Sequence, residues 1–256
     1  MPSAPADHRG GARADQLLVE HGLAPSRTAA QRLIEAGRVS WSAGTIDKAA
    51  TILPPSAELT VAGDESDRYV SRGGIKLAGA LAHTGIDVAG RTCLDVGQST
   101  GGFTDCLLQA GAERVIGIDV GHGQLYPRLC DDARVTCIEG VNARALAEAR
   151  LPHAHFDLIV ADVSFISLTL VLPQLPPLLA RNGDMLLLVK PQFEVGAAHI
   201  GKGGIVRDDS LYIQVEEKLR LAAANAHLRV IDYFDSPIAG GDGNREFFIW
   251  TQHEPN

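Results

Sequence analysis

A glycine-rich loop follows a short apolar run and precedes a helix-length stretch. The loop and the acid just before it contribute six candidate cofactor ligands: Asp95, Gly97, Ser99, Thr100, Gly101 and Gly102. Glycines let a backbone approach a ligand closely. Asp119 ends the next apolar run, 22 residues after Gly97, which is close to the offset of about 20 residues at which an acid binds a ribose. Loop and acid together favour an adenosine-containing cofactor over a mere tight turn.

The type of cofactor follows from what the loop lacks. It is not the Gly-x-Gly-x-x-Gly loop that binds a pyrophosphate in dinucleotide enzymes. S-adenosylmethionine has no pyrophosphate, so it fits this pattern better than NAD. Asn142 follows the third apolar run, where it could contact an adenine or cap a helix.

A further acid and a lysine stand at the ends of neighbouring runs. Asp162 follows the fourth apolar run and Lys190 follows the fifth. Carboxyl ends of parallel strands meet at one edge of a sheet, so both side chains are expected at one crevice. A surface ion pair is the alternative interpretation. No Pro-Pro follows Asp162 and no cysteine follows a proline, which argues against methyl transfer to amino groups or to base carbons.

Apolar runs and helix-length stretches alternate over the region that holds these residues. The predicted strands are Thr92–Val96, Arg114–Ile118, Val135–Ile138, Asp157–Ala161, Met185–Val189, Arg229–Phe234 and Phe247–Trp250. The predicted helices are Gly102–Ala110, Leu125–Cys130, Leu168–Ala180 and Leu211–Ala226. This alternation predicts an α/β fold with a mostly parallel sheet covered on both faces.

A smaller α+β segment precedes a polar break at residues 63–68. It contains a short helix at 15–21 and a second helix at 27–36, which Ser26 caps and Gly37 ends. A strand at 39–41 and a tight turn at 43–45 follow. With arginines on its first helical turns, this segment is either a nucleic-acid-binding module or a pair of capped helices with solvated arginines.

Composition narrows the function classes further. Lys and Arg total 23 against 31 Asp and Glu, a net charge of −8, so any nucleic-acid contact needs a local basic patch. The four cysteines, Cys93, Cys106, Cys130 and Cys137, form no C-x-x-C pair, which argues against a zinc knuckle. No stretch approaches the roughly 20 apolar residues of a membrane helix, and the first nine residues lack a signal-peptide core. We therefore expect a soluble, cytoplasmic protein.

Five motifs together resemble the TlyA (hemolysin A) family, which belongs to the FtsJ-type ribose 2′-O-methyltransferases. They are Ser71–Leu77, Asp95–Asp105, Ala161–Leu168, Val189–Glu194 and Gly240–Phe247. The stretch from Arg13 to Lys48 resembles an S4 RNA-binding domain in the same register. Its hairpin, Ser40–Gly44, departs from the usual Val-Asn-Gly, and Lys48-Ala49 replaces the usual Lys-Pro.

The resemblance implies an S4-like domain at 10–62, a linker at 63–68 and a seven-stranded, Rossmann-like methyltransferase domain at 69–252. It implies a catalytic Lys-Asp-Lys-Glu tetrad formed by Lys76, Asp162, Lys190 and Glu246. It places nucleoside contacts on Asp119 and Asn142, with Asp162 also near the cofactor. RNA contacts fall on Arg13, Ser26, Arg27, Arg32, Arg38 and Lys48.

The implied reaction is methyl transfer from S-adenosylmethionine to a ribose hydroxyl, on a cytidine of ribosomal RNA or of a ribosomal subunit, by a metal-free monomer. A lysine can act as the base only if its pKa falls, and a second nearby cation lowers that pKa. Two alternatives stay open, a non-enzymatic ribosome-assembly protein and a membrane-active haemolysin. The intact tetrad argues against the first, and the lack of a membrane-length or basic amphipathic helix argues against the second.

Overall fold

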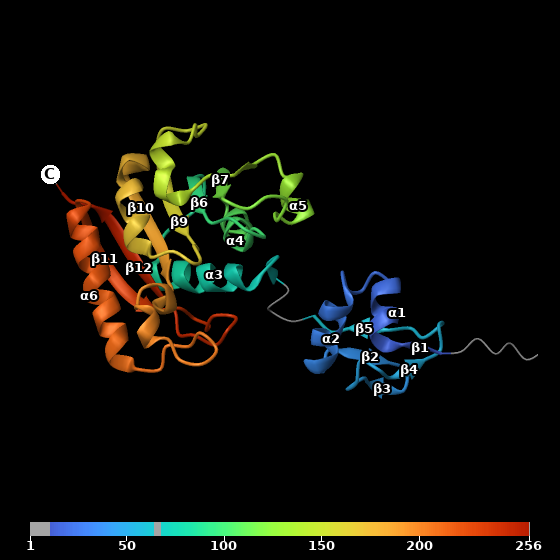
Figure 1. The fold of residues 1–256 in the computed structure, drawn as a ribbon. Helices are drawn as coiled ribbons and strands as arrows, with labels where there is room; N and C mark the ends of the chain where they lie inside the picture. Colours follow the sequence, from blue (N-terminus) through green and yellow to red (C-terminus); the bar gives the residue numbers. More distant parts are fainter. Residues whose placement is uncertain (1–10, 64–67, 256) are drawn as a thin grey trace, which may run out of the picture. The chain divides into compact units, whose positions relative to one another are not determined.

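The chain divides into two compact units, Met1–Glu65 and Ser66–Asn256, which Figure 1 shows in a computed structural model. The structure describes residues 11–63 and 68–255. Most of the predicted linker at 63–68 and the first residue of the predicted domain at 10–62 therefore lie outside the described residues.

The N-terminal unit is a pair of helices packed on short strands. Its elements are β1 (Ala12–Arg13), α1 (Ala14–Glu20), α2 (Arg27–Glu35), β2 (Val39–Trp41), β3 (Gly44–Thr45), β4 (Ile52–Leu53) and β5 (Thr60–Val61). β1 pairs with β4, and β2 pairs with β3 and β5, all antiparallel. Leu17, Leu18 and Ile34 are buried between the helices and strands. The predicted helix pair and hairpin are both present.

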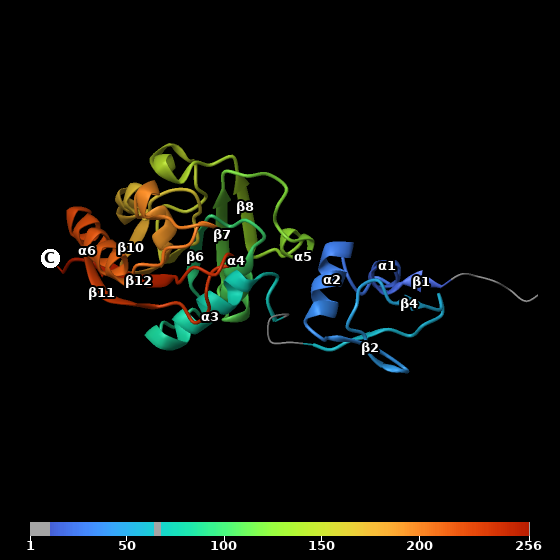
Figure 2. The same cartoon turned by 60° about the horizontal axis from the view of Figure 1, so that its bottom comes forward.

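A twisted sheet forms the centre of the second unit (Figure 2). Within residues 68–255 its seven strands are β6 (Thr92–Val96), β7 (Arg114–Asp119), β8 (Val135–Glu139), β9 (Phe156–Ala161), β10 (Leu179–Val189), β11 (Leu228–Asp235) and β12 (Phe247–His253). Their order is β11-β12-β10-β9-β6-β7-β8. β12 is antiparallel to both of its neighbours, and the pairs from β10 to β8 are parallel. Each predicted strand lies within one of these, so the α/β fold class is confirmed.

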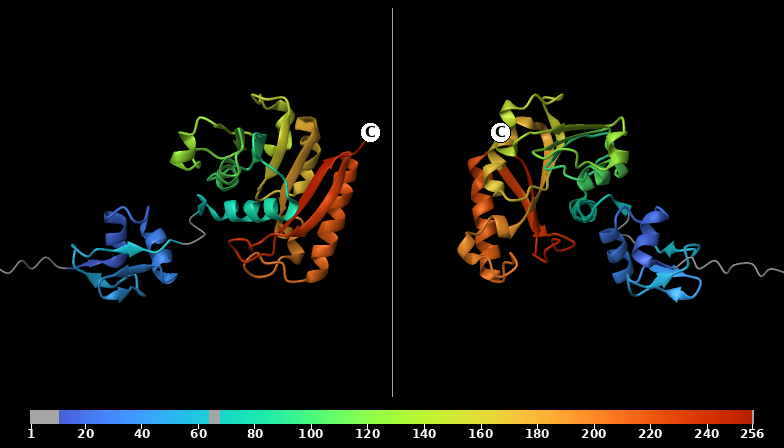
Figure 3. Two further views of the ribbon diagram at one scale, coloured as in Figure 1. Left: turned by 180° about the vertical axis from the view of Figure 1, so that it is seen from behind. Right: turned by 45° about the vertical axis from the view of Figure 1, so that its right-hand side comes forward.

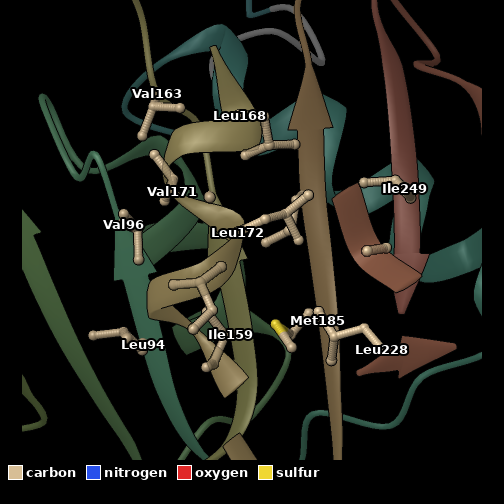
Figure 4. Close-up of a cluster of buried hydrophobic side chains, with 14 of the residues drawn as sticks. Leu94, Val96, Ile159, Val163, Leu168, Val171, Leu172, Met185, Leu228 and Ile249 are labelled. Carbon is tan, nitrogen blue, oxygen red and sulfur yellow. The ribbon is translucent and has the colours of Figure 1, made fainter. Parts of the chain in front are cut away.

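Helices cover both faces of this sheet (Figure 3). One face packs on α3 (Arg72–Thr84), α4 (Gly102–Gln109) and α5 (Pro127–Cys130). The other face packs on α6 (Asp209–Asn225) and on the short turns η2 (Ala143–Glu148), η3 (Leu168–Leu170), η4 (Leu172–Gln174) and η5 (Pro176–Leu178). Figure 4 shows the core on this side, where Leu168, Val171 and Leu172 meet Ile159 and Met185. Both faces being apolar explains why the strands lack an alternating pattern.

Two predicted helices were wrong in extent. The stretch Leu168–Ala180 is not an α-helix: it forms the three 3-10 turns η3, η4 and η5, and β10 already begins at Leu179. Prolines at 173, 176 and 177 lack the N–H that an α-helix needs, so only single turns form. The predicted helix Leu125–Cys130 shrinks to α5, which begins at Pro127. Among the described residues, no helix is both long and apolar enough to cross a membrane.

Candidate active site

The glycine-rich loop joins β6 to α4 and brings the backbone of neighbouring strands together. Gly97 has φ +84°, and a Cβ there would lie 2.7 Å from the carbonyl oxygen of Asp162, so only glycine fits. Ser99 also has a positive φ, +46°, which is uncommon for a residue with a side chain. Its N–H donates to Asp119 Oδ2 at 2.8 Å. The loop is thus tied to the end of β7.

A cavity of about 580 Å³ opens between this loop and the ends of β7, β8 and β9. Asp119 lines it, with Oδ1 accepting a hydrogen bond from the Gly121 N–H at 2.7 Å. Asn142 lines it too, and its side chain caps η2 by accepting from the Arg144 N–H at 3.0 Å. Asn142 therefore caps a helical turn and lines the cavity at the same time. Val96, Ile118, Val120 and Val163 add apolar walls.

A smaller cavity of about 130 Å³ adjoins the first at the loop. It shares Gly97, Ser99, Asp162 and Ser164 with the larger cavity. It adds residues from the starts of α3 and α4 and the end of β10: Ser71, Gly73, Gln98, Thr100, Gly102, Phe103 and Lys190. The shared residues make the two cavities one continuous site along the carboxyl edge of the sheet.

Asp162 and Lys190, which follow β9 and β10, form a close ion pair. Lys190 Nζ lies 2.5 Å from Asp162 Oδ1 and donates to Ser164 Oγ at 2.8 Å. Their side chains are 11% and 22% exposed for Lys190 and Asp162. The structure therefore joins the two charged residues that the sequence places at neighbouring strand ends.

Lys76 and Glu246 form a second, more deeply buried pair. Lys76 lies on α3, and its Nζ is 2.6 Å from Glu246 Oε2 just before β12; the side chains are 9% and 3% exposed. Burial raises the pKa of Glu246, and the hydrogen bond and charge of Lys76 oppose that rise. Each lysine of the predicted tetrad therefore has a carboxylate as its immediate partner.

A third cavity, of about 510 Å³, contains three members of the predicted tetrad: Lys76, Lys190 and Glu246. The fourth member, Asp162, does not line this cavity but contacts Lys190 through their ion pair. Ser164 and Phe165 line this cavity as well as the 580 Å³ cavity, so they mark the junction of the two. Phe165 is 92% exposed and has φ +63°. A bulky side chain in that conformation is strained, and such strain clusters at functional sites.

Two predicted cofactor residues lie away from the cavities. Asp95 is fully buried at the end of β6, where Oδ2 accepts from Thr104 Oγ1 at 2.7 Å. Burial raises its pKa to about 7. Gly101 faces inward, and a Cβ there would clash with the side chain of Leu129. Asp95 is therefore enclosed in the protein interior and Gly101 lies within the loop, and neither lines one of the three cavities.

The predicted RNA-binding residues of the N-terminal unit have varied surroundings. Arg13 and Arg27 both pair with the buried Asp15. Ser26 caps α2 by accepting from the Ala29 N–H at 3.3 Å. The Arg38 guanidinium donates to the Ala62 carbonyl at 2.9 and 2.8 Å. The side chains of two others are exposed: Arg32 and Lys48.

Sequence reasoning gave no role to Ser164, Phe165 or Gln192. Gln192 lines the third cavity, and its buried Oε1 has no hydrogen-bond partner among the described residues. Ser164 and Phe165 lie directly after Asp162 at the carboxyl end of β9, and Gln192 lies two residues after Lys190. All three lie inside the motifs Ala161–Leu168 and Val189–Glu194, so their positions were in view although no role was given to them. The helix that carries Lys76 was also not predicted.

Comparison with protein families decides the assignment. Residues 69–253 match the model of the FtsJ-like methyltransferase family, and residues 12–58 match the S4 domain. The chain is 45% identical over 241 residues to the 16S/23S rRNA (cytidine-2′-O)-methyltransferase TlyA of Mycobacterium tuberculosis, which covers 94% of this chain and 90% of that protein. The chain belongs to the TlyA family of FtsJ-like methyltransferases.

Two further proteins support the same assignment. Hemolysin A of Brachyspira hyodysenteriae is 37% identical, over 92% of this chain and 97% of its own length. The solved structure of a Streptococcus thermophilus protein is 38% identical and superposes with a TM-score of 0.74, over 96% of this chain and 90% of that one. The chain is therefore a methyltransferase with an S4 domain, as predicted.

Proposed function

We propose that this protein transfers a methyl group from S-adenosylmethionine to the ribose 2′-hydroxyl of a cytidine in ribosomal RNA, in the cytoplasm. One observation carries the proposal: the cavity lined by Asp119 and Asp162 meets a cavity lined by Lys76, Lys190 and Glu246, and Ser164 and Phe165 line both. The rRNA (cytidine-2′-O)-methyltransferase named among the relatives supports the choice of substrate.

The cofactor cavity suits S-adenosylmethionine. Asp119 offers a carboxylate to the two ribose hydroxyls, and Asn142 lies beside it where an adenine would stack among Ile118 and Val163. The adjoining small cavity, bordered by the Gly97–Gly102 loop and Asp162, is left for the methionine part. When bound, the cofactor supplies a methyl group already activated on a sulfonium.

Lys190 removes the proton of the attacking hydroxyl, and Asp162 positions Lys190. As the ribose oxygen bonds to the methyl carbon and the carbon–sulfur bond breaks toward sulfur, the hydroxyl proton must leave. Lys190 accepts it when its amine is neutral, with Asp162 and Ser164 fixing the position of Nζ. Lys76 and Glu246 pair with each other and line the same cavity as Lys190. Because the methyl donor is already activated, positioning supplies much of the rate.

Phe165 is suited to hold the target base. Its ring is exposed and its centroid lies 5.2 Å from that of Phe193, and both aromatic side chains line the cavity that contains Lys190. Unstacked bases of single-stranded RNA are recognised by stacking on aromatic side chains. A base stacked on Phe165 would leave its ribose beside Lys190.

The N-terminal unit docks the RNA. The match to an S4 domain supports this role, and the candidate contacts are arginines and a lysine on α2 and nearby loops. Contacts of this type bind phosphates and fix the register of the RNA without reading its sequence.

The proposal is tested by incubating the purified protein with each ribosomal subunit, and with the deproteinised rRNAs, in the presence of methyl-labelled S-adenosylmethionine. Digestion of the RNA to nucleosides and mass spectrometry identify the product. We expect the label in 2′-O-methylcytidine. Label in a base-methylated nucleoside or in ribosomal protein would contradict the proposal.

A further inference from the structure

The helices of the N-terminal unit are linked by one buried carboxylate. Asp15, the second residue of α1, is fully buried, and its oxygens accept four hydrogen bonds. Arg13 donates from Nε at 2.9 Å and from Nη2 at 3.1 Å, and Arg27 donates from Nη2 at 3.0 Å. Gln31, one turn after Arg27 on α2, donates from Nε2 at 3.1 Å. These bonds, with that from Arg13 foremost, hold the pKa of Asp15 well below its usual range.

The two arginines are held side by side while remaining open to solvent. Arg13 Nη2 and Arg27 Nη2 contact the same oxygen, Asp15 Oδ2, so their guanidinium groups are neighbours. Their side chains are 37% and 54% exposed for Arg13 and Arg27. Each guanidinium has five N–H donors, and Asp15 uses only two from Arg13 and one from Arg27. Among residues 11–63 and 68–255, no group accepts from the remaining donors, which leaves them for a ligand.

This cluster does more than the fold of the unit requires. The rest of its core is apolar, and a buried ion pair is weak evidence for stability because desolvation offsets the attraction. Without the carboxylate, two adjacent guanidinium groups would repel each other, and both long side chains would regain their rotamer freedom. Asp15 removes both costs before any ligand arrives.

We propose that Asp15 is a positioning residue for RNA binding. It holds the guanidinium groups of Arg13 and Arg27 side by side, ready to bind backbone phosphates. The fork geometry of guanidinium matches phosphate oxygens, and a preordered pair loses less entropy on binding than two free side chains. The inference rests on the proposed docking of rRNA by this unit and adds the residue that organises the contact.

The direction in which one substitution changes the affinity for RNA distinguishes a positioning role from a purely electrostatic one. Asp15→Asn removes a negative charge, which by charge alone strengthens RNA binding. Glu20→Gln is the matched control, because Glu20 is an exposed acid on the same helix and undergoes the same loss of charge. We expect Asp15→Asn to weaken binding of purified 16S and 23S rRNA about tenfold and to lower the salt slope by about one. Glu20→Gln should bind as the wild type does, or more tightly.

Further readouts exclude a merely structural effect. In rRNA methyl transfer, Asp15→Asn should raise KM with kcat unchanged. In a background of Arg13→Ala and Arg27→Ala, Asp15→Asn should cause no further loss of affinity, because the groups it positions are gone. Arg27→Lys, which keeps the charge but not the fork, should also weaken binding, and it tests the idea if Asp15→Asn does not fold.

The outcome that overturns the inference is Asp15→Asn or Arg27→Lys binding rRNA as tightly as the wild type. A loss from Asp15→Asn that persists in the double-arginine background would also overturn it. Failure of the wild-type protein to bind rRNA at all would instead contradict the proposed docking role of the whole unit.

Discussion

The buried acid just before the cofactor loop gives a prediction whose size follows from the structure. Asp95 is fully buried, and burial raises its pKa from 3.8 to about 7. Between these values the folded protein holds a proton that the unfolded chain has released. The free energy of unfolding therefore falls as pH rises from about 4 to about 7, by up to about 1.4 kcal/mol per pH unit.

Asp95→Asn removes this dependence while keeping an oxygen that can accept from Thr104. The variant should gain stability relative to the wild type by about 2 kcal/mol between pH 5 and pH 7, because the dependence flattens as the pH approaches the folded pKa of about 7. If the amide that Asp95→Asn introduces leaves a buried N–H without an acceptor, the free energy of unfolding is lowered by about 1–3 kcal/mol, and by the same amount at every pH. The change with pH, and not the value at any one pH, is the test.

Urea unfolding followed by tryptophan fluorescence measures this difference. The chain has two tryptophans. Trp41 lies in the N-terminal unit and Trp250 lies on β12, so a Trp41→Phe background makes Trp250 the reporter for the methyltransferase unit. Asp131→Asn, at an exposed acid of the same unit, controls for the substitution itself. A difference between Asp95→Asn and the wild type that stays constant from pH 5 to pH 7 would refute the reasoning.

Three further predictions concern the cavities. Asp119→Ala should weaken S-adenosylmethionine binding by about 2 kcal/mol or more, since charge-assisted hydrogen bonds contribute about 1.5–3 kcal/mol each; unaltered affinity by calorimetry would contradict it. Phe165→Ala should raise KM for rRNA about tenfold or more, because stacking on one base contributes about 1–3 kcal/mol. Phe165→Tyr keeps the ring and serves as the control, and equal KM values for Phe165→Ala and the wild type would exclude a stacking role. Glu246→Gln should destabilise the unit by about 3–5 kcal/mol by leaving the Lys76 ammonium buried and unpaired, and Lys76→Met in the same chain should recover part of that loss in urea unfolding.

Strand positions could be predicted from the sequence because both faces of the sheet are covered. Each strand then appears as an apolar run, as Thr92–Val96 does, and the charged residue at its end identifies the functional edge. The ends of β9 and β10 could therefore be paired from the sequence alone, and Asp162 and Lys190 do lie in contact.

Helix α3 could not be predicted as readily, although it carries Lys76. Its first turns contain Gly73 and Gly74, which are poor helix formers. The structure shows why glycine is needed there: a Cβ at Gly74 would clash with the ring of Tyr69. Close packing overrides propensity at this point. In Leu168–Ala180 the opposite happened, since the length of the stretch between two predicted strands suggested a helix and proline prevented it.

The partners of the other charged groups could not be predicted from the sequence. Arg13, Arg27 and Asp15 are spread over two helices and a strand, and only the fold brings them to one point. Likewise Lys76 and Glu246 are separated by most of the methyltransferase unit. A sequence motif shows that a charged residue is present, but the residues that contact its side chain are set by tertiary packing.

Single-turnover methyl transfer to rRNA as a function of pH tests most directly whether Lys190 takes the proton. The comparison uses the wild type, Lys190→Ala and Lys190→Arg, with cofactor affinity measured in parallel. We predict a loss of about 10²-fold or more for Lys190→Ala with cofactor binding retained, and no rescue by Lys190→Arg, because an arginine does not lose its proton. A Lys190→Arg enzyme that transfers methyl groups at the wild-type rate would contradict the role of Lys190 as base.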